Sequence, residues 1–94
     1  MLVERSELTV REGGADGFVA AMKETGLALL GGVAGVRSVK IGQGVENPGK
    51  FILLVEWESI DAHANYSKIP TSQEFRALIG PFLQGGAMEH FNMW

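Results

Sequence analysis

Two histidines and one tyrosine are the side chains of this sequence best suited to acid–base chemistry. His63 and Tyr66 lie three residues apart in a segment with helical spacing, and His90 lies in the last ten residues. An imidazole titrates near neutral pH, so either histidine could take a proton from a bound substrate. A tyrosine can donate a hydrogen bond to a substrate oxygen or stack on an aromatic ring. We therefore predict that His63, Tyr66 and His90 are the catalytic residues.

The same three side chains also have structural interpretations, which the sequence leaves open. The ring of His63 could cap its helix or pack against Trp57. Tyr66 could close that helix against the core, and His90 could line either a pocket or the boundary with a second subunit. Where the fold places these residues decides between a catalytic and a structural role.

Metal-dependent and covalent chemistry lack their sequence signatures. The chain has no cysteine, which excludes disulfides, thiolate ligands and cysteine nucleophiles. Two histidines alone do not complete a metal site, and Glu56 and Glu58 have no recognised ligand spacing to them, so we predict no bound metal. Ser6 is not in a Gly-x-Ser-x-Gly elbow, which argues against a hydrolase nucleophile. The glycine-containing loop at 42–44 lacks the third glycine of a dinucleotide site.

Composition narrows the fold class and the partners. The 94 residues are 46% hydrophobic and 20% charged, which fits one folded domain over residues 1–94. Eight Lys and Arg against eleven Asp and Glu give a net charge of -3, and the basic residues do not cluster, so we expect no nucleic acid partner. The charged start lacks the apolar region of a signal peptide, and no stretch approaches the ~20 apolar residues of a membrane span. We therefore expect a cytoplasmic protein with no membrane partner.

The first half of the chain predicts a strand, a helix and a second strand. Leu2 to Arg11 alternates like a strand, with Leu2, Leu8 and Val10 in one register. Apolar residues then recur at helical spacing from Asp16 to Val33, in a helix that Gly26 weakens and that the glycines at 31–32 close. Val36 to Ile41 follows as the second strand.

The second half of the chain predicts a third strand, a short helix, a second long helix and a last strand. A Gly- and Pro-bearing loop leads into a third strand that starts at Lys50, which is typical of a hairpin. Ser59 is a good cap for a short helix. The sequence at 71–74 resembles a capping box and predicts the start of a second long helix, and Met88 to Trp94 predicts the last strand. The order β-α-β-β-α-β predicts a ferredoxin-like α+β fold, with a four-stranded antiparallel sheet and both helices on one face.

The third strand is apolar on both faces, which a two-layer fold does not need. Phe51, Leu53, Val55 and Trp57 point one way, and Ile52 and Leu54 the other. The helices can cover only one face of the sheet. We therefore predict a homodimer in which the open faces of two sheets pack together, and aggregation of any variant that blocks this pairing.

Several short motifs carry a resemblance to a known family. WESIDAH (57–63), AGV (34–36), LIGPF (78–82) and MEHF (88–91) together make the chain similar to the antibiotic biosynthesis monooxygenase family. The resemblance implies a dimeric α+β barrel with a substrate pocket in each subunit, between the helices and the sheet. It also implies oxidation of aromatic polyketides, quinols or haem by molecular oxygen, often without a metal or flavin.

The haem-degrading branch of this family does not fit. Its first-strand Asn, its second Trp and its haem-ligating His correspond here to Ser6, Tyr66 and Ile79.

Cofactor-free oxygenation needs an electron-rich phenol or anthrone, whose carbanion can reduce oxygen by one electron once a base has removed its proton.

The resemblance therefore implies a monooxygenase, without a cofactor, that acts on a small aromatic, polyketide or quinol-like ligand. A non-catalytic small-molecule-binding or stress-related dimer on the same scaffold is the alternative, and an isomerase or lyase with one histidine as base is a third possibility. The predicted substrate-binding residues are a first-strand serine and four aromatic residues: Ser6, Trp57, Phe75, Phe82 and Phe91.

Overall fold

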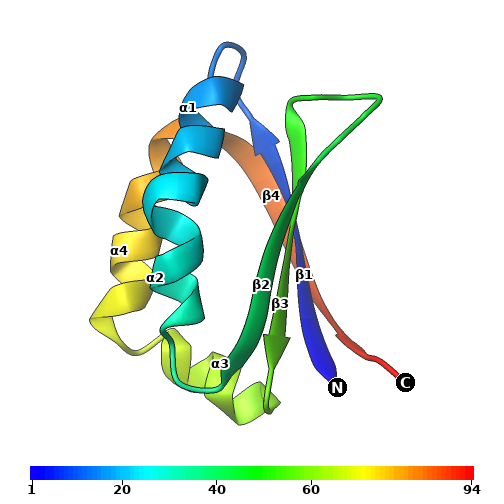
Figure 1. The fold of residues 1–94 in the computed structure, drawn as a ribbon, viewed down its shortest axis with the longest axis vertical. Helices are drawn as coiled ribbons and strands as arrows, with labels where there is room; N and C mark the ends of the chain where they lie inside the picture. The colour runs from blue at the N-terminus through cyan, green and yellow to red at the C-terminus, as the bar shows by residue number, and fades with distance from the viewer.

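The computed structural model describes residues 1–94 and has two layers, a sheet and a set of helices that covers one face of it (Figure 1). The four strands are all antiparallel and lie in the order β2-β3-β1-β4. Their bounds are β1 Leu2–Val10, β2 Val36–Gln43, β3 Lys50–Trp57 and β4 Leu83–Asn92. This arrangement confirms the predicted ferredoxin-like α+β fold.

The first helical region is continuous, as predicted from 16 to 33, but it has three parts. α1 (Ala15–Ala21) passes through a π-helical segment (Met22–Gly26) into α2 (Leu27–Gly31). A Cβ on Gly26 would lie 2.8 Å from the sulfur of Met22 and 3.3 Å from the ring of Phe75. Glycine at this position is therefore what lets the first helical region and the last helix approach closely.

The two helices of the second half begin in different ways. α3 (Ile60–Tyr66) has the predicted cap, because Ser59 Oγ accepts a hydrogen bond from the backbone N–H of Ala62 at 3.1 Å. α4 (Pro70–Ile79) begins one residue before the predicted capping box at 71–74, and the capping-box prediction is wrong. Pro70 takes the first helical position, where a missing N–H costs nothing. The side chain of Ser72 instead donates back to the carbonyl of Ile69 at 2.9 Å.

The last strand is longer than predicted and starts earlier. β4 follows a short 3₁₀ turn (Gly80–Phe82) and pairs with β1 from Leu83 opposite Val10 to Asn92 opposite Leu2. Gly85 and Gly86 lie inside this ladder, although neighbouring glycines more often separate two elements. A nine-residue β1 offers hydrogen-bond partners along this whole length, and that pairing outweighs the weak strand preference of glycine.

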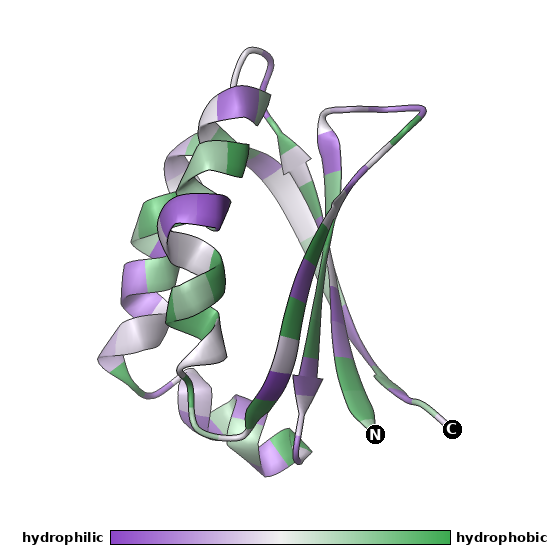
Figure 2. Cartoon of the chain, in the orientation of Figure 1, coloured by the Kyte–Doolittle hydropathy of each residue, from purple (hydrophilic) through white to green (hydrophobic).

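The core lies between the sheet and the helices. Alternation is visible along β2 in Figure 2, where hydrophobic and hydrophilic residues follow one another. β3 places its odd-numbered residues inward, as predicted, with Phe51, Leu53, Val55 and Trp57 at most 3% exposed. The buried hydrophobic cluster comes from β1, β3, the first helical region with the turn after it, and α4: Leu8, Val10, Phe18, Met22, Leu30, Val33, Phe51, Leu53, Val55, Trp57, Phe75 and Ile79.

The other face of the sheet has no helix over it (Figure 1). Ile52 and Leu54 lie on this face, as predicted, and each remains partly exposed. Leu54 lies between Lys40 of β2 and Arg5 of β1 in the strand register. We call this surface the open face. No helix of the chain is both long enough and apolar enough to cross a membrane.

Candidate active site

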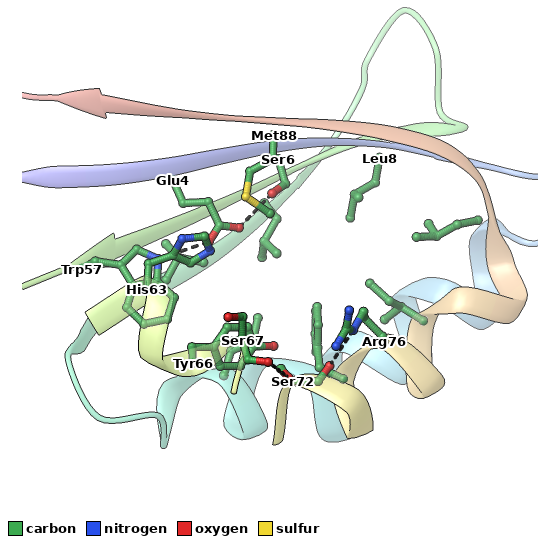
Figure 3. Close-up of a pocket in the computed structure, with 16 residues that line it drawn as sticks. Glu4, Ser6, Leu8, Trp57, His63, Tyr66, Ser67, Ser72, Arg76 and Met88 are labelled. Carbon is green, nitrogen blue, oxygen red and sulfur yellow. Dashed lines mark hydrogen bonds and ion pairs between the residues drawn. The ribbon is translucent and has the colours of Figure 1, made fainter. Parts of the chain in front are cut away.

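A cavity of about 350 Å³ lies between the inner face of the sheet and the helices (Figure 3). Ten of its sixteen lining residues are hydrophobic, as is usual for a site that holds a small organic molecule. β1 and β3 form its floor, while α3 and α4 supply its opposite wall. Its lining residues are Glu4, Ser6, Leu8, Leu30, Leu53, Val55, Trp57, His63, Tyr66, Ser67, Ser72, Phe75, Arg76, Ile79, Leu83 and Met88. We call it the central cavity.

Glu4 is a buried carboxylate at one end of the central cavity. It is only 5% exposed, because β1 turns its even-numbered residues toward the core. Its Oε2 accepts a hydrogen bond from Ser6 Oγ at 2.8 Å, and its Oε1 accepts one from Trp57 Nε1 at 3.1 Å. These two fixed donors satisfy the buried carboxylate and hold it in one orientation.

His63 connects Glu4 to the second histidine. Its Nε2 lies 3.3 Å from Glu4 Oε1, and its Nδ1 lies 3.1 Å from His90 Nε2. A carboxylate oxygen can only accept a proton donor, so the nearby Glu4 favours the tautomer of neutral His63 that carries its proton on Nε2. Nδ1 is then the acceptor and His90 Nε2 the donor. The three side chains form a chain of polar contacts from β1 through α3 to β4, made of a close contact between Glu4 and His63 and a hydrogen bond between His63 and His90.

The environment of His63 favours its neutral form. Its ring lies at an edge to the ring of Trp57, with centroids 5.1 Å apart, and it also neighbours Tyr66. Burial lowers the pKa of His63 below its usual value of 6.5, and the nearby His90 adds to this, while the charge of Glu4 opposes it. A neutral imidazole that faces a carboxylate on one side is suited to accept a proton on the other.

Tyr66 is held as a neutral phenol in the same wall. Burial, and next the negative charge of Glu4, raise its pKa to about 12, while the positive charge of Arg76 acts in the opposite direction. The phenol therefore keeps its proton under all ordinary conditions and can donate a hydrogen bond to a substrate oxygen.

Arg76 is the one Lys or Arg side chain that lines the central cavity, and it was not among the predicted site residues. Its Nε donates to the backbone carbonyl of Ser72 at 3.3 Å, and no carboxylate lies within 4.0 Å of it. In Figure 3 the guanidinium lies toward the space between α4 and the sheet, at the end away from Glu4. A substrate oxygen that carries negative charge would find its counter-charge there.

The structure brings most of the predicted residues together. Ser6, Trp57 and Phe75 line the central cavity with His63 and Tyr66. Three of these residues, Ser6, Trp57 and His63, contact Glu4, which was not among the predicted site residues. Its even-numbered position, shared with Leu8 and Val10, was the signal for an inward side chain.

The other predicted residues lie outside the lining of the central cavity. His90 reaches it only through its contact with His63. Phe82 packs over Gly17, at whose position a Cβ would be 2.6 Å from the phenylalanine ring. Phe91 lines a groove on the open face instead. The substrate-binding roles of Phe82 and Phe91 therefore have no contact with this cavity to support them.

Glu4, His63 and His90 could also supply three ligands to a metal ion. One donor atom from each lies within 4.8 Å of the other two. The prediction that no metal binds rested on the presence of only two histidines and on the lack of a recognised ligand spacing between them and Glu56 or Glu58. Glu4 is the carboxylate that the fold brings to the histidines.

Fold and cavity together define a class of protein. It is a ferredoxin-like α+β domain with an apolar small-molecule cavity and a chain of acid–base groups at one end. The sequence matches the family model described as antibiotic biosynthesis monooxygenase over residues 1–78. The chain belongs to this family, as the resemblance of its motifs indicated.

Solved structures that carry the same family description share the fold. One from Bordetella bronchiseptica superposes with a TM-score of 0.92 at 23% sequence identity, covering 99% of this chain and 96% of that chain. One from Nitrosomonas europaea has a TM-score of 0.84 at 14% identity, with 99% and 98% covered. One from Deinococcus radiodurans has a TM-score of 0.82 at 12% identity, with 100% and 93% covered. Identities this low establish the fold alone. No curated protein shows significant sequence similarity to the chain.

Proposed function

We propose that the protein is a cofactor-independent monooxygenase that oxidises a small, electron-rich aromatic compound, such as an anthrone or a quinol, in the central cavity. Family membership supports the class of reaction. The single observation that carries the proposal is the chain of polar contacts from Glu4 through His63 to His90, which meets a mostly apolar cavity of about 350 Å³. A cavity of this size suits a small polycyclic or quinol-like molecule.

The reaction needs no external reductant when the substrate supplies all electrons. For an anthrone, a base removes a proton from the CH₂ carbon, and the carbanion transfers one electron to O₂. The resulting radicals combine in a C–O bond to give a peroxide anion, which takes a proton back from the base, and the hydroperoxide then loses water to leave a ketone. One oxygen atom enters the product and the other leaves as water, so a four-electron oxidation of carbon matches the four-electron reduction of O₂.

Each polar residue of the cavity has a role in this scheme. His63 Nδ1 gives up the hydrogen bond to His90 and accepts the substrate proton instead. Glu4 then stabilises the resulting imidazolium from the side of Nε2. His90 is partly exposed at the edge strand and offers the proton a route to solvent. Tyr66 and Arg76 stabilise the negative charge that develops on the substrate oxygen, in a cavity that is lined mostly by hydrophobic side chains.

Oxygen uptake with a panel of anthrones and quinols tests the proposal. We expect uptake by the wild-type protein and a loss on the order of 10²-fold or more in His63→Ala. His90→Ala should lose less, because His63 remains. Asn65→Ala, an exposed change on the same helix, is the matched control. No uptake across the panel would favour a non-catalytic small-molecule-binding protein, and uptake that survives both histidine substitutions would remove the proposed base.

The proposal includes a homodimer that packs through the open face. Leu54, Phe91 and Met93 surround a groove of about 380 Å³ on this face, and the last two are exposed. The same groove carries Arg5, Lys40 and Glu56. A surface with both signs of charge around apolar residues can be complementary to a second copy of itself. Pairing would close two sheets into an α+β barrel and leave each central cavity within its own subunit.

A further inference from the structure

We propose that Glu4, His63 and His90 form a binding site for a divalent first-row transition-metal ion. Two imidazoles and one carboxylate are donors that such ions prefer, and they come from three elements that only the tertiary fold brings together. The inference goes beyond the proposed function, which uses the same residues without a metal.

The spacing of the donors suits a shared ion after small side-chain movements. Ligand atoms bound to one zinc ion at ~2.0–2.2 Å lie roughly 3 to 3.5 Å from one another. Here Glu4 Oε1 lies 3.3 Å from one nitrogen of His63, and His90 Nε2 lies 3.1 Å from the other. His63 can give only one nitrogen to the ion, so the two imidazole rings must turn until one nitrogen of His63 lies near both Glu4 Oε1 and His90 Nε2. All three donors already lie within 4.8 Å of one another, so the movement is short.

Two of the three ligands can make this movement at low cost. His63 lies in the short helix α3, and His90 lies in β4, which is the edge strand of the sheet. Glu4 is the fixed member, because Trp57 Nε1 and Ser6 Oγ each donate to one of its oxygens. Hydrogen bonds from outer residues to a ligating carboxylate are a regular feature of metal sites, and each oxygen keeps a second lone pair for the ion.

The arrangement leaves coordination positions that face the central cavity. Glu4 and His63 both line that cavity, so an ion held between them and His90 would meet a bound small molecule or water. Two histidines and one carboxylate with open positions is the donor set of many catalytic zinc and non-haem iron sites. Calcium and magnesium prefer sites made only of oxygen and should bind poorly.

Metal binding and metal-free catalysis exclude each other at this site. An ion at His63 takes the lone pair that the substrate proton needs, so a bound metal should block oxygen uptake by the mechanism proposed above. An experiment can therefore contradict the metal site without contradicting the metal-free oxygenation, and the reverse.

Titration of untagged, chelator-treated protein with Co²⁺ tests the site directly, because bound cobalt absorbs visible light. We expect one ion per chain, bound at micromolar concentration or below, and displacement by Zn²⁺ but not by Mg²⁺. His90→Ala and Glu4→Gln should each weaken binding by at least about 10-fold. Glu58→Gln removes an exposed carboxylate outside the cluster and should leave binding unchanged. His90 is at the sheet edge, so its substitution keeps the test valid even if Glu4 variants fold poorly.

Three outcomes separate the two proposals. Saturable binding that needs His90 and inhibits oxygen uptake supports the metal site and the metal-free reaction. Saturable binding that oxygen uptake requires supports the site and overturns the cofactor-independent function. No saturable binding, or binding unchanged in both His90→Ala and Glu4→Gln, overturns the site, whatever the oxygen uptake.

Discussion

The indole N–H of Trp57 donates to the buried carboxylate of Glu4 at 3.1 Å, which ties the end of β3 to the start of β1. Trp57 is 1% exposed and Glu4 is 5% exposed, so neither group has water as an alternative partner. The same carboxylate oxygen lies 3.3 Å from His63. One buried acceptor therefore holds a strand pair together and sets the orientation of the proposed base.

Glu4→Ala should destabilise the protein and inactivate it. The substitution leaves the N–H of Trp57 and the hydroxyl of Ser6 buried without an acceptor, at a cost of about 1–3 kcal/mol for each unpaired group. Glu4→Gln keeps the volume and one carbonyl oxygen, so it should cost less. Urea unfolding measures both. Glu46→Gln, in an exposed loop, should change the free energy of unfolding by less than about 0.5 kcal/mol, and an equal effect of all three variants would contradict the buried network.

Tyr66 should resist ionisation until strongly alkaline pH. It is the one tyrosine of the chain, so the rise of phenolate absorbance near 295 nm reports it alone. Its pKa is raised to about 12 from 10.0, first by burial and then by Glu4. A raised pKa in the folded state means that folding favours the neutral phenol. This contribution to stability is complete below pH 10 and is lost as the pH rises from 10.0 to about 12.

Variants around Tyr66 should move its pKa in opposite directions. Glu4→Gln removes a nearby negative charge and should lower the pKa, and Arg76→Gln removes a positive charge and should raise it. Circular dichroism at each pH has to show that the protein is still folded. A midpoint near 10 in the folded wild-type protein would mean that this side chain is not buried beside Glu4.

Leu54→Lys should block the proposed dimer. Leu54 lies between Lys40 and Arg5 in the strand register, so the substitution creates a row of three positive charges on the open face. We expect light scattering to give a dimer for the wild-type protein and a smaller, aggregation-prone species for the variant. Ile60→Lys, at an exposed apolar position on α3, is the control and should remain dimeric. A wild-type monomer at working concentration would refute the sheet-to-sheet dimer.

The strands and helices follow from the sequence because each depends on residues close together in the chain. The alternation of β3 and the spacing of the helical segments predicted the layers directly. The chain of Glu4, His63 and His90 depends instead on register, which places His90 opposite Glu4 on the neighbouring strand. Residue types alone carry no register, so the sequence does not show that Glu4 meets the two histidines.

The aromatic residues show the same limit. Phe91 follows His90 directly, and in a strand the two side chains must point to opposite faces. His90 lies toward His63, so Phe91 has to face the open side, where the structure places it. Alternation within β4 contained this information, and the assignment of Phe91 to the substrate pocket did not use it.

Gly35→Ala should displace α3 and lower activity without touching the cavity. Gly35 has a φ of +88°, which an alanine adopts with strain, and a Cβ there would lie 2.5 Å from the Cβ of Ala62. Ala62 precedes His63, so relief of this contact moves the helix that carries the proposed base. We expect a loss of stability of about 1–3 kcal/mol and a drop in oxygen uptake larger than the unfolded fraction explains.

Gly31→Ala is the matched control, because its Cβ would meet nothing within 4 Å and its φ is not positive. This variant should keep full stability and full uptake. Unchanged unfolding and uptake in Gly35→Ala would show that the turn before β2 does not fix the position of His63.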